Sequence, residues 1–420
     1  MSKQLCIRFV FALTALATMP GVDGGRAAAE DTPLPWKAAV ATAKITPKRP
    51  LPMAGYAGRK EPAEGAETDL YAKCVALQDQ QGHRVVMVTL DLIGVLEELR
   101  TKVASEVEKR HGLPAHALLM NASHTHCGPA YGRDDTKDYF NELADHLVRI
   151  IGESLENMTP ARLTYSFSKA SVAMNRRTPS GDTFLNHPNP FGPVDHTVPV
   201  LSVRGEDDQL RAVVFGYACH NTTMGFRKWL GDYAGYAQQY LEEDHPGLTA
   251  LFMMGCGGDQ NPYPRSELKF AQQHGRTLAT AVEAALEVNQ RTPRHQRPVS
   301  GPLQTLLETV DLSFTKDSGR PDFPYPVQVV RFGDDVMIVA LGNEVVVDYS
   351  LRLKSELTRP DGPAIWVAGY SNVYSGYVPS RRVLLEGGYE AQSRPWQPDL
   401  EERIVGKVHQ LVNRTHASEQ

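Results

Sequence analysis

The segment LLMNASHTHCGP, residues 118–129, decides the fold class, because an apolar run passes directly into a pair of histidines. Four other segments repeat this pattern of an apolar run followed by polar residues: AVVFGYACHNTTM (212–224), LFMMGCGGDQNP (251–262), VMIVALGNE (336–344) and AIWVAGYSNVYSGY (364–377). Ligands of α/β proteins bind outside the carboxyl ends of the strands. Strand ends that carry histidines, an aspartate, a glutamate and tyrosines therefore predict one active site, built around zinc.

The alternation of apolar runs with helical patterns predicts an α/β fold with a mixed β-sheet core flanked by helices, and an active site at the strand C-terminal ends. Strands are expected at residues 38–45, 84–95, 117–120, 161–173, 198–203, 212–217, 251–254, 303–314, 326–332, 336–341 and 364–367. Helices are expected at residues 96–110, 136–157, 236–243, 267–288, 345–357 and 400–413. Residues 177–195 are rich in Pro, Gly, Asn and Asp and predict a long loop, and residues 292–302 predict a linker between two halves.

Residues 1–29 have the pattern of a secretory signal peptide, with Lys3 and Arg8 before an apolar stretch and an alanine triplet at 27–29. The pattern predicts export to the periplasm or the extracellular space and leaves residues 30–420 as a single catalytic domain. The apolar stretch is shorter than the roughly 20 residues of a stable membrane span. An uncleaved N-terminal anchor is the alternative.

Composition narrows the class of partner. The formal net charge is -5 in 420 residues, and the sequence contains no long run of basic residues. Neither feature indicates a nucleic-acid partner. After loss of the signal, four cysteines remain: Cys74, Cys127, Cys219 and Cys256. In an exported protein two of them could pair, and buried thiols are the alternative. The sequence leaves the oligomeric state open.

Each candidate site residue has an ordinary structural alternative when it is taken alone. His124 and His126 alternate along an extended segment, so that both imidazoles can face one cavity. His220 at a strand end could be merely hydrogen-bonded, Glu344 could be a carboxylate that favours a helix N-terminus, and Tyr377 could belong to the core. Their joint occurrence at strand ends is what favours a catalytic zinc site, which usually takes three protein ligands and keeps one position open.

Six short motifs, in the same order along the chain, resemble the neutral, non-lysosomal ceramidase family over about residues 37–395. They are HTHCGP (124–129), NR (175–176), ACHNTTM (218–224), GDYAGYA (231–237), GNE (342–344) and SNVYSGYV (371–378). The resemblance implies zinc ligands at His124, His220, Glu344 and Tyr377. It also implies that His126 contacts the substrate or transition state, that Arg176 is an active-site arginine, and that Tyr389 hydrogen-bonds the substrate amide.

Two departures from the family pattern bear on the substrate. Asn261 stands where the family has an active-site serine, and an asparagine can form hydrogen bonds but cannot accept an acyl group. The immunoglobulin-like C-terminal domain of family ceramidases is expected to be absent, since the chain ends soon after Tyr377. Asp259 and Asn261 are then expected to orient water or substrate.

The sequence thus predicts a secreted zinc-dependent amidohydrolase whose substrate is an N-acyl amide, either ceramide or a related lipid. The mostly polar residues 177–195 favour a short or polar acyl chain over a long one. A zinc esterase or lactonase, a non-lipid amidase, and a zinc-containing binding protein without turnover are the alternatives.

Overall fold

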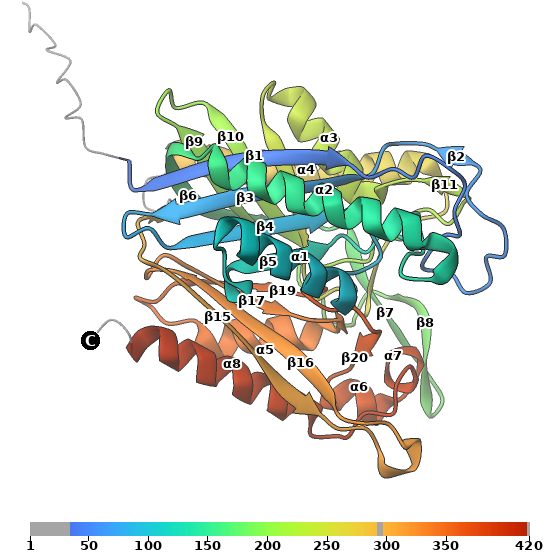
Figure 1. Ribbon diagram of the computed structural model, residues 1–420. Coiled ribbons are helices and arrows are strands. Elements are labelled where there is room, and N and C mark those ends of the chain that lie inside the picture. Colours follow the sequence, from blue (N-terminus) through green and yellow to red (C-terminus); the bar gives the residue numbers. More distant parts are fainter. Residues whose placement is uncertain (1–33, 292–296, 418–420) are drawn as a thin grey trace, which may run out of the picture. The chain divides into compact units, whose positions relative to one another are not determined.

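Two β-sheets packed face to face form the centre of the computed structural model, which describes residues 34–291 and 297–417 (Figure 1). The larger sheet has the strand order β12-β10-β9-β6-β1-β3-β4-β5, with β14 paired to β6. Its strands are β1 (Trp36–Lys44), β3 (Tyr71–Asp79), β4 (Arg84–Leu90), β5 (Leu118–Ala122), β6 (Thr159–Lys169), β9 (Thr197–Gly205), β10 (Leu210–Tyr217), β12 (Thr249–Met254) and β14 (Arg297–Val299). The smaller sheet has the order β15-β16-β17-β19, from β15 (Leu303–Leu312), β16 (Phe323–Phe332), β17 (Val336–Leu341) and β19 (Ala364–Ala368).

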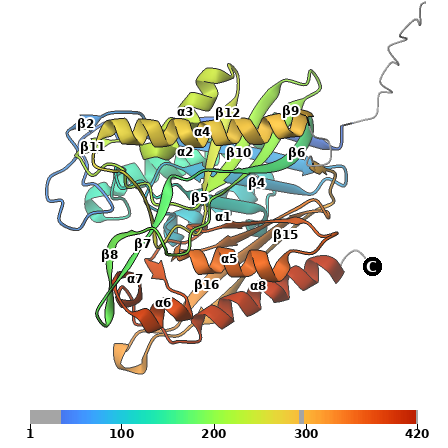
Figure 2. The ribbon, with the colours of Figure 1, turned by 180° about the vertical axis from the view of Figure 1, so that it is seen from behind.

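Helices cover the outer face of each sheet, which gives four layers in the order α, β, β, α (Figures 1 and 2). The larger sheet is covered by α1 (Glu97–His111), α2 (Lys137–Glu156), α3 (Asp232–Asp244) and α4 (Leu268–Arg291). The smaller sheet is covered by α5 (Val347–Leu357) and α8 (Leu400–Ala417). The predicted α/β class with a mixed sheet and flanking helices is therefore confirmed.

The layering explains why the strands are apolar throughout instead of alternating with polar residues. In β3, Cys74 and Ala76 face the helices, whereas Val75 and Leu77 face the smaller sheet, and all four are fully buried. Successive strand side chains point to opposite faces, so a sheet covered on both sides needs apolar residues on both.

The predicted elements are recovered with small shifts, and two predictions were wrong. Residues 177–195 are not a loop, because β7 (Ala173–Ser180) and β8 (Thr183–Asn189) form a hairpin that also pairs with β13 (Gln260–Pro262). The composition misled because β8 is mostly exposed, so its polar residues face solvent on a strand. Of the expected linker, residues 297–299 join the larger sheet as β14, and residues 292–296 lie outside the described part of the chain. The predicted signal peptide, residues 1–29, also lies outside it.

The four cysteines expected in the mature chain are buried free thiols, and no disulfide joins them. Burial raises the pKa of Cys74 to about 12 and raises the pKa of the other three thiols as well. Protonated, buried thiols are poor nucleophiles. Among the helices of the described residues, none is both long and apolar enough to cross a membrane.

Asp91 directly follows β4. Because of this residue, we expect the free energy of unfolding to fall as pH rises. Its carboxylate accepts hydrogen bonds from the Tyr71 N–H (2.9 Å) and the Gln238 amide (3.4 Å), and burial raises its pKa to about 6. An unfolded carboxyl ionises near pH 3.8, so between pH 4 and 6 the folded state holds more protons. The stability contributed by the protonated group is complete below that range and is lost as pH rises through 6.

Asp91→Asn should therefore flatten this pH dependence. We expect the difference in free energy of unfolding between variant and wild type to change by roughly 3 kcal/mol from pH 4 to pH 7. Urea unfolding at a series of pH values measures it. The exposed Asp138→Asn is the matched control and should follow the wild type. An unchanged pH profile for Asp91→Asn would contradict the assignment.

Candidate metal centre

Three histidines that follow two different strands meet at one point. His124 and His126 come after β5, and His220 comes after β10. One ring nitrogen from each lies within 4.8 Å of the other two, and all three side chains are buried. A buried group of three histidines could bind a metal ion.

Glu344 and Tyr377 reach the same point from the smaller sheet. They lie directly opposite each other in a short parallel pair, β18 (Glu344–Val345) and β20 (Tyr377–Val378), which follow β17 and β19. Glu344 Oε2 is 3.2 Å from His124 Nε2 and 3.4 Å from His220 Nε2. The Tyr377 hydroxyl is 3.3 Å from His220 Nε2.

These separations match the requirements of a tetrahedral metal. Donor atoms about 2.0–2.1 Å from zinc lie about 3.3 Å from one another when they are tetrahedrally arranged. Glu344 Oε2 is buried and, although it lies at ion-pair distance from the two imidazoles, it has no hydrogen-bond partner of acceptable geometry. A buried carboxylate oxygen without a donor is costly, and a cation at this point would satisfy it. The residues therefore fit a bound metal ion.

Backbone carbonyls orient the two imidazoles nearest Glu344. His124 Nδ1 lies 2.6 Å from the Ile93 carbonyl oxygen, and His220 Nδ1 lies 2.7 Å from that of Gly257. With the proton on Nδ1 for these bonds, each Nε2 turns a lone pair toward the centre. Metal-binding histidines usually donate their second ring N–H in this way.

The electrostatics also suit a cation. Burial lowers the pKa of His220 to about 3 and lowers the pKa of His126 well below its usual value, so these imidazoles are neutral. Burial alone would raise the pKa of Glu344, but its close contacts with His124 and His220 hold that pKa well below its usual range. The centre thus offers imidazole nitrogens and a carboxylate to a cation.

Left-handed backbone at non-glycine residues surrounds the centre. His124 has φ 62°, Asn343 beside Glu344 has φ 64°, and Tyr370 and Asn372 have φ 50° and 64°. Such conformations cost about 1–3 kcal/mol each and persist where the surroundings impose them. Tyr370, whose ring centroid lies 4.6 Å from that of His124, was missed by the sequence analysis because it resembles a core residue.

His126 is the third histidine of the group and packs against Gly55 and Tyr56. Its Nε2 lies 3.1 Å from His124 Nε2, and its buried Nδ1 has no partner. Gly55 packs against the ring so closely that a Cβ there would lie 2.4 Å from it, and the Tyr56 ring meets it edge-on at 4.7 Å. Sequence reasoning missed both, because a single Gly-Tyr pair in a Pro- and Gly-rich segment gives no specific signal.

Arg176 connects Tyr377 to Asn261. The Arg176 guanidinium donates to the Tyr377 hydroxyl at 2.9 Å and to Asn261 Oδ1 at 3.2 Å. Tyr389 is 55% exposed, and its ring packs edge-on against Tyr377 at 5.3 Å. Arg176, Asn261 and Tyr389 therefore extend the site outward from the candidate metal ligands toward solvent.

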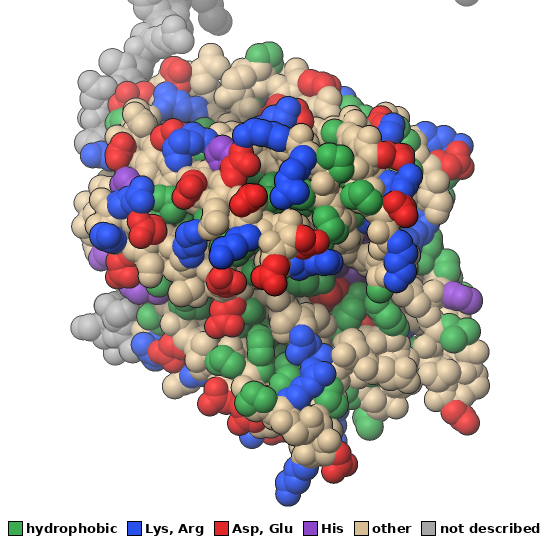
Figure 3. Space-filling view, turned by 45° about the vertical axis from the view of Figure 1, so that its right-hand side comes forward, with side chains coloured by type: hydrophobic (Ala, Val, Ile, Leu, Met, Phe, Trp, Pro, Cys, Tyr) green, Lys and Arg blue, Asp and Glu red, His purple; other side chains and the backbone are tan. Residues whose placement is uncertain are grey.

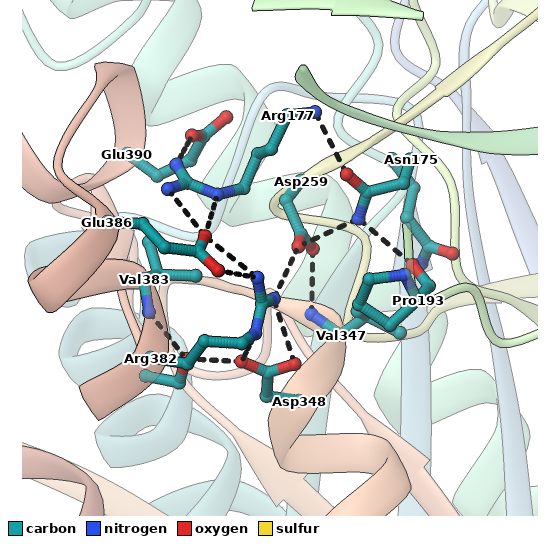
Figure 4. Close-up of polar contacts among 12 residues, drawn as sticks. Asn175, Arg177, Pro193, Asp259, Val347, Asp348, Arg382, Val383, Glu386 and Glu390 are labelled. Carbon is teal, nitrogen blue, oxygen red and sulfur yellow. Dashed lines mark hydrogen bonds and ion pairs between the residues drawn. The ribbon is translucent and has the colours of Figure 1, made fainter. Parts of the chain in front are cut away.

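Asp259 is placed differently from the other predicted residues, since its contacts are structural (Figure 4). One carboxylate oxygen accepts from the Val347 N–H at the start of α5 (2.8 Å), and the other accepts from the Asn175 amide (3.2 Å). Burial raises its pKa to about 6. Asp259 thus anchors the start of α5 to β7, and its expected role on water or substrate stays a prediction.

Comparisons with known proteins agree with this geometry. The family model described as neutral/alkaline non-lysosomal ceramidase, N-terminal, matches residues 39–253, just over half of the chain. The match includes His124, His126, Arg176 and His220 and stops before the remaining candidates.

Curated relatives and solved structures give a similar picture. Neutral ceramidase A of Dictyostelium discoideum is 25% identical over 243 residues, covering 51% of this chain and 34% of that protein. Neutral ceramidase of Drosophila melanogaster is 25% identical over 255 residues, covering 54% and 36%. The matched region thus spans about a third of each relative's length. The crystal structure of neutral ceramidase from Pseudomonas aeruginosa superposes with a TM-score of 0.74 at 19% identity, covering 88% of this chain and 72% of that one.

Proposed function

The chain belongs to the neutral/alkaline non-lysosomal ceramidase family, and on that premise we propose that it is a zinc-dependent hydrolase of N-acyl amides of the ceramide type. The observation that carries the proposal is the buried group formed by His124, His220, Glu344 and Tyr377, whose donor atoms are spaced as a tetrahedral metal requires. Zinc binds imidazole and carboxylate donors, and a four-coordinate catalytic zinc can take a fifth ligand such as a small molecule.

The residues around the centre have distinct proposed roles. Zinc, when bound, would polarise the amide carbonyl and lower the pKa of a water molecule to about 7. His126 is neutral and buried, so its imidazole can offer a hydrogen bond to the carbonyl oxygen as negative charge develops there. Arg176 and Tyr389 would hold the oxyanion and the amide, and Asn261 would orient the substrate through its contact with Arg176.

Export is part of the proposal and is supported by the signal-like pattern of residues 1–29. The proposed partner is a small acyl-amide or lipid molecule. Figure 3 shows acidic and basic side chains interspersed over the face that it presents, in keeping with the small net charge. Such a surface does not favour a polyanionic partner.

Hydrolysis of a panel of N-acyl sphingoid amides with short and long acyl chains tests the substrate class. We expect kcat/KM for short acyl chains to equal or exceed that for long ones, because β8, which packs against the helix that begins at Tyr389, exposes mostly polar side chains. The ring of Phe184 on β8 already has a partner, because the Arg177 guanidinium lies over it at 5.1 Å. A lipid groove would instead add about 0.8 kcal/mol for each buried methylene.

Matched acyl esters and lactones belong in the same panel. Turnover of esters without turnover of amides would replace the amidase proposal by an esterase, and zinc binding without any turnover would indicate a binding protein. A steep rise of kcat/KM with chain length would contradict the short-chain preference and favour long-chain ceramide.

A further inference from the structure

Two consecutive arginines of β7, Arg176 and Arg177, point their guanidinium groups at the same carboxylate. Neighbouring residues of a regular strand point to opposite faces of the sheet. Here the pairing of β7 with β8 shifts register between Asn175 and Arg177. Such a bulge re-aims a side chain, and bulges are common beside active sites. The bulge in β7 allows the side chains of both arginines to reach the same side of the hairpin.

The shared carboxylate is that of Glu390, in the short helix α7 (Tyr389–Gln392). Arg176 Nε donates to Glu390 Oε1 at 2.9 Å, and Arg177 Nη1 donates to Oε2 at 2.5 Å. All three side chains are buried. Burial alone would raise the pKa of Glu390, but the two arginines outweigh it and lower the pKa, so the group is a carboxylate.

The backbone before α7 fixes the position of Glu390. Gly387 and Gly388 have φ 70° and 81°, in the region that favours glycine. A Cβ on Gly388 would lie 2.5 Å from the Phe184 carbonyl oxygen of β8, so only glycine allows this approach. The turn therefore presses α7 against the hairpin that carries the arginines.

We propose that Glu390 is a positioning residue that holds the Arg176 guanidinium against Tyr377 and Asn261 at the metal centre. The other two partners of Arg176 are a hydroxyl and an amide oxygen, so Glu390 supplies the charged contact that selects its rotamer. A long arginine side chain without that contact has many rotamers available. Glu390 thus acts on the site through Arg176.

The network continues away from the centre, and this provides a control residue (Figure 4). Arg177 donates to Glu386 at 3.0 Å, and Glu386 accepts from Arg382 at 2.8 Å. Arg382 forms a two-bond pair with Asp348 on α5, at 3.0 Å for each bond. Among the described residues, Glu386 therefore forms hydrogen bonds with Arg177 and Arg382 but not with Arg176.

Kinetics of Glu390→Gln and Glu386→Gln test the role at the site, and this arm rests on the proposed function. We expect Glu390→Gln to lower kcat about tenfold with KM within about threefold, because a misplaced group weakens the transition state more than substrate binding. Glu386→Gln should keep kcat within about threefold. Glu390→Asp keeps the charge and the fold but shortens the reach, so it should fall between the two.

A second arm does not depend on activity and can be run on metal-free protein. The Nε–Hε resonances of Arg176 and Arg177 can be assigned by NMR from Arg176→Lys and Arg177→Lys. We expect Glu390→Gln and Glu390→Asp to shift both resonances and Glu386→Gln to shift that of Arg177 alone. If wild type hydrolyses no amide, the proposed function fails, while this arm still decides the positioning. An unmoved Arg176 resonance in the Glu390 variants, or an equal loss of kcat in Glu386→Gln, would overturn the inference.

Discussion

Replacing His220 by alanine should reduce bound zinc from about one ion per chain to below about one tenth. The variant loses a ligand whose Nδ1 is already fixed by the Gly257 carbonyl and whose Nε2 faces Glu344 and Tyr377. We expect kcat/KM to fall by at least about 10³-fold, because a Lewis acid supplies several kcal/mol of transition-state stabilisation. Metal analysis by mass spectrometry and amide hydrolysis measure the two effects.

Two histidine variants serve as controls. The exposed His187→Ala should change neither quantity. His126→Ala should keep its zinc and lose activity, since His126 is proposed to contact the substrate although it belongs to the three-histidine group. Full zinc occupancy in His220→Ala would remove His220 from the ligand set, and zinc loss in His126→Ala would add His126 to it.

Replacing Asn261 by alanine should lower the rate of amide hydrolysis by roughly 10- to 100-fold, somewhat less than the loss of one oxyanion-hole donor. Asn261 Oδ1 accepts a hydrogen bond from Arg176, and Thr222 Oγ1 lies 3.4 Å away. The variant leaves the Arg176 guanidinium with one contact fewer beside Tyr377. Initial rates with a short-chain amide, at full metal occupancy, measure the effect.

The same residue bears on the route of hydrolysis. Because asparagine cannot accept an acyl group, no covalent acyl intermediate should accumulate on the wild-type enzyme. The buried thiols of Cys127 and Cys256, whose pKa values burial raises, are poor alternatives. Mass spectrometry after rapid acid quench checks this, and an acyl adduct on any residue would contradict direct attack by water. Thr222→Val, which removes only the weaker hydroxyl contact, should keep most of the rate and is the matched control.

The sequence by itself determined the fold class and the place of the site, whereas the packing of two separate sheets was not predicted. Apolar runs such as residues 336–341 predicted strands, and the polar residues after them predicted where ligands gather. His124, His220, Glu344 and Tyr377 were proposed together from strand ends and family motifs, and the structure brings them together. Local patterns were sufficient here, because a buried strand and the residue that ends it occupy consecutive positions in the sequence.

Only the tertiary structure decided how distant segments meet. The bulge in the β7–β8 hairpin turns Arg176 and Arg177 toward Glu390, which lies 214 residues after Arg176, and Gly388 approaches β8 from a similarly distant segment. The sequence placed Asp259 after a strand, but only the structure shows that its carboxylate binds the start of α5 and the Asn175 amide. A hydrogen-bonding side chain has several possible partners, and nothing in its local sequence shows which of them folding will bring within 3 Å. That choice is made by the packing of the two sheets and their turns.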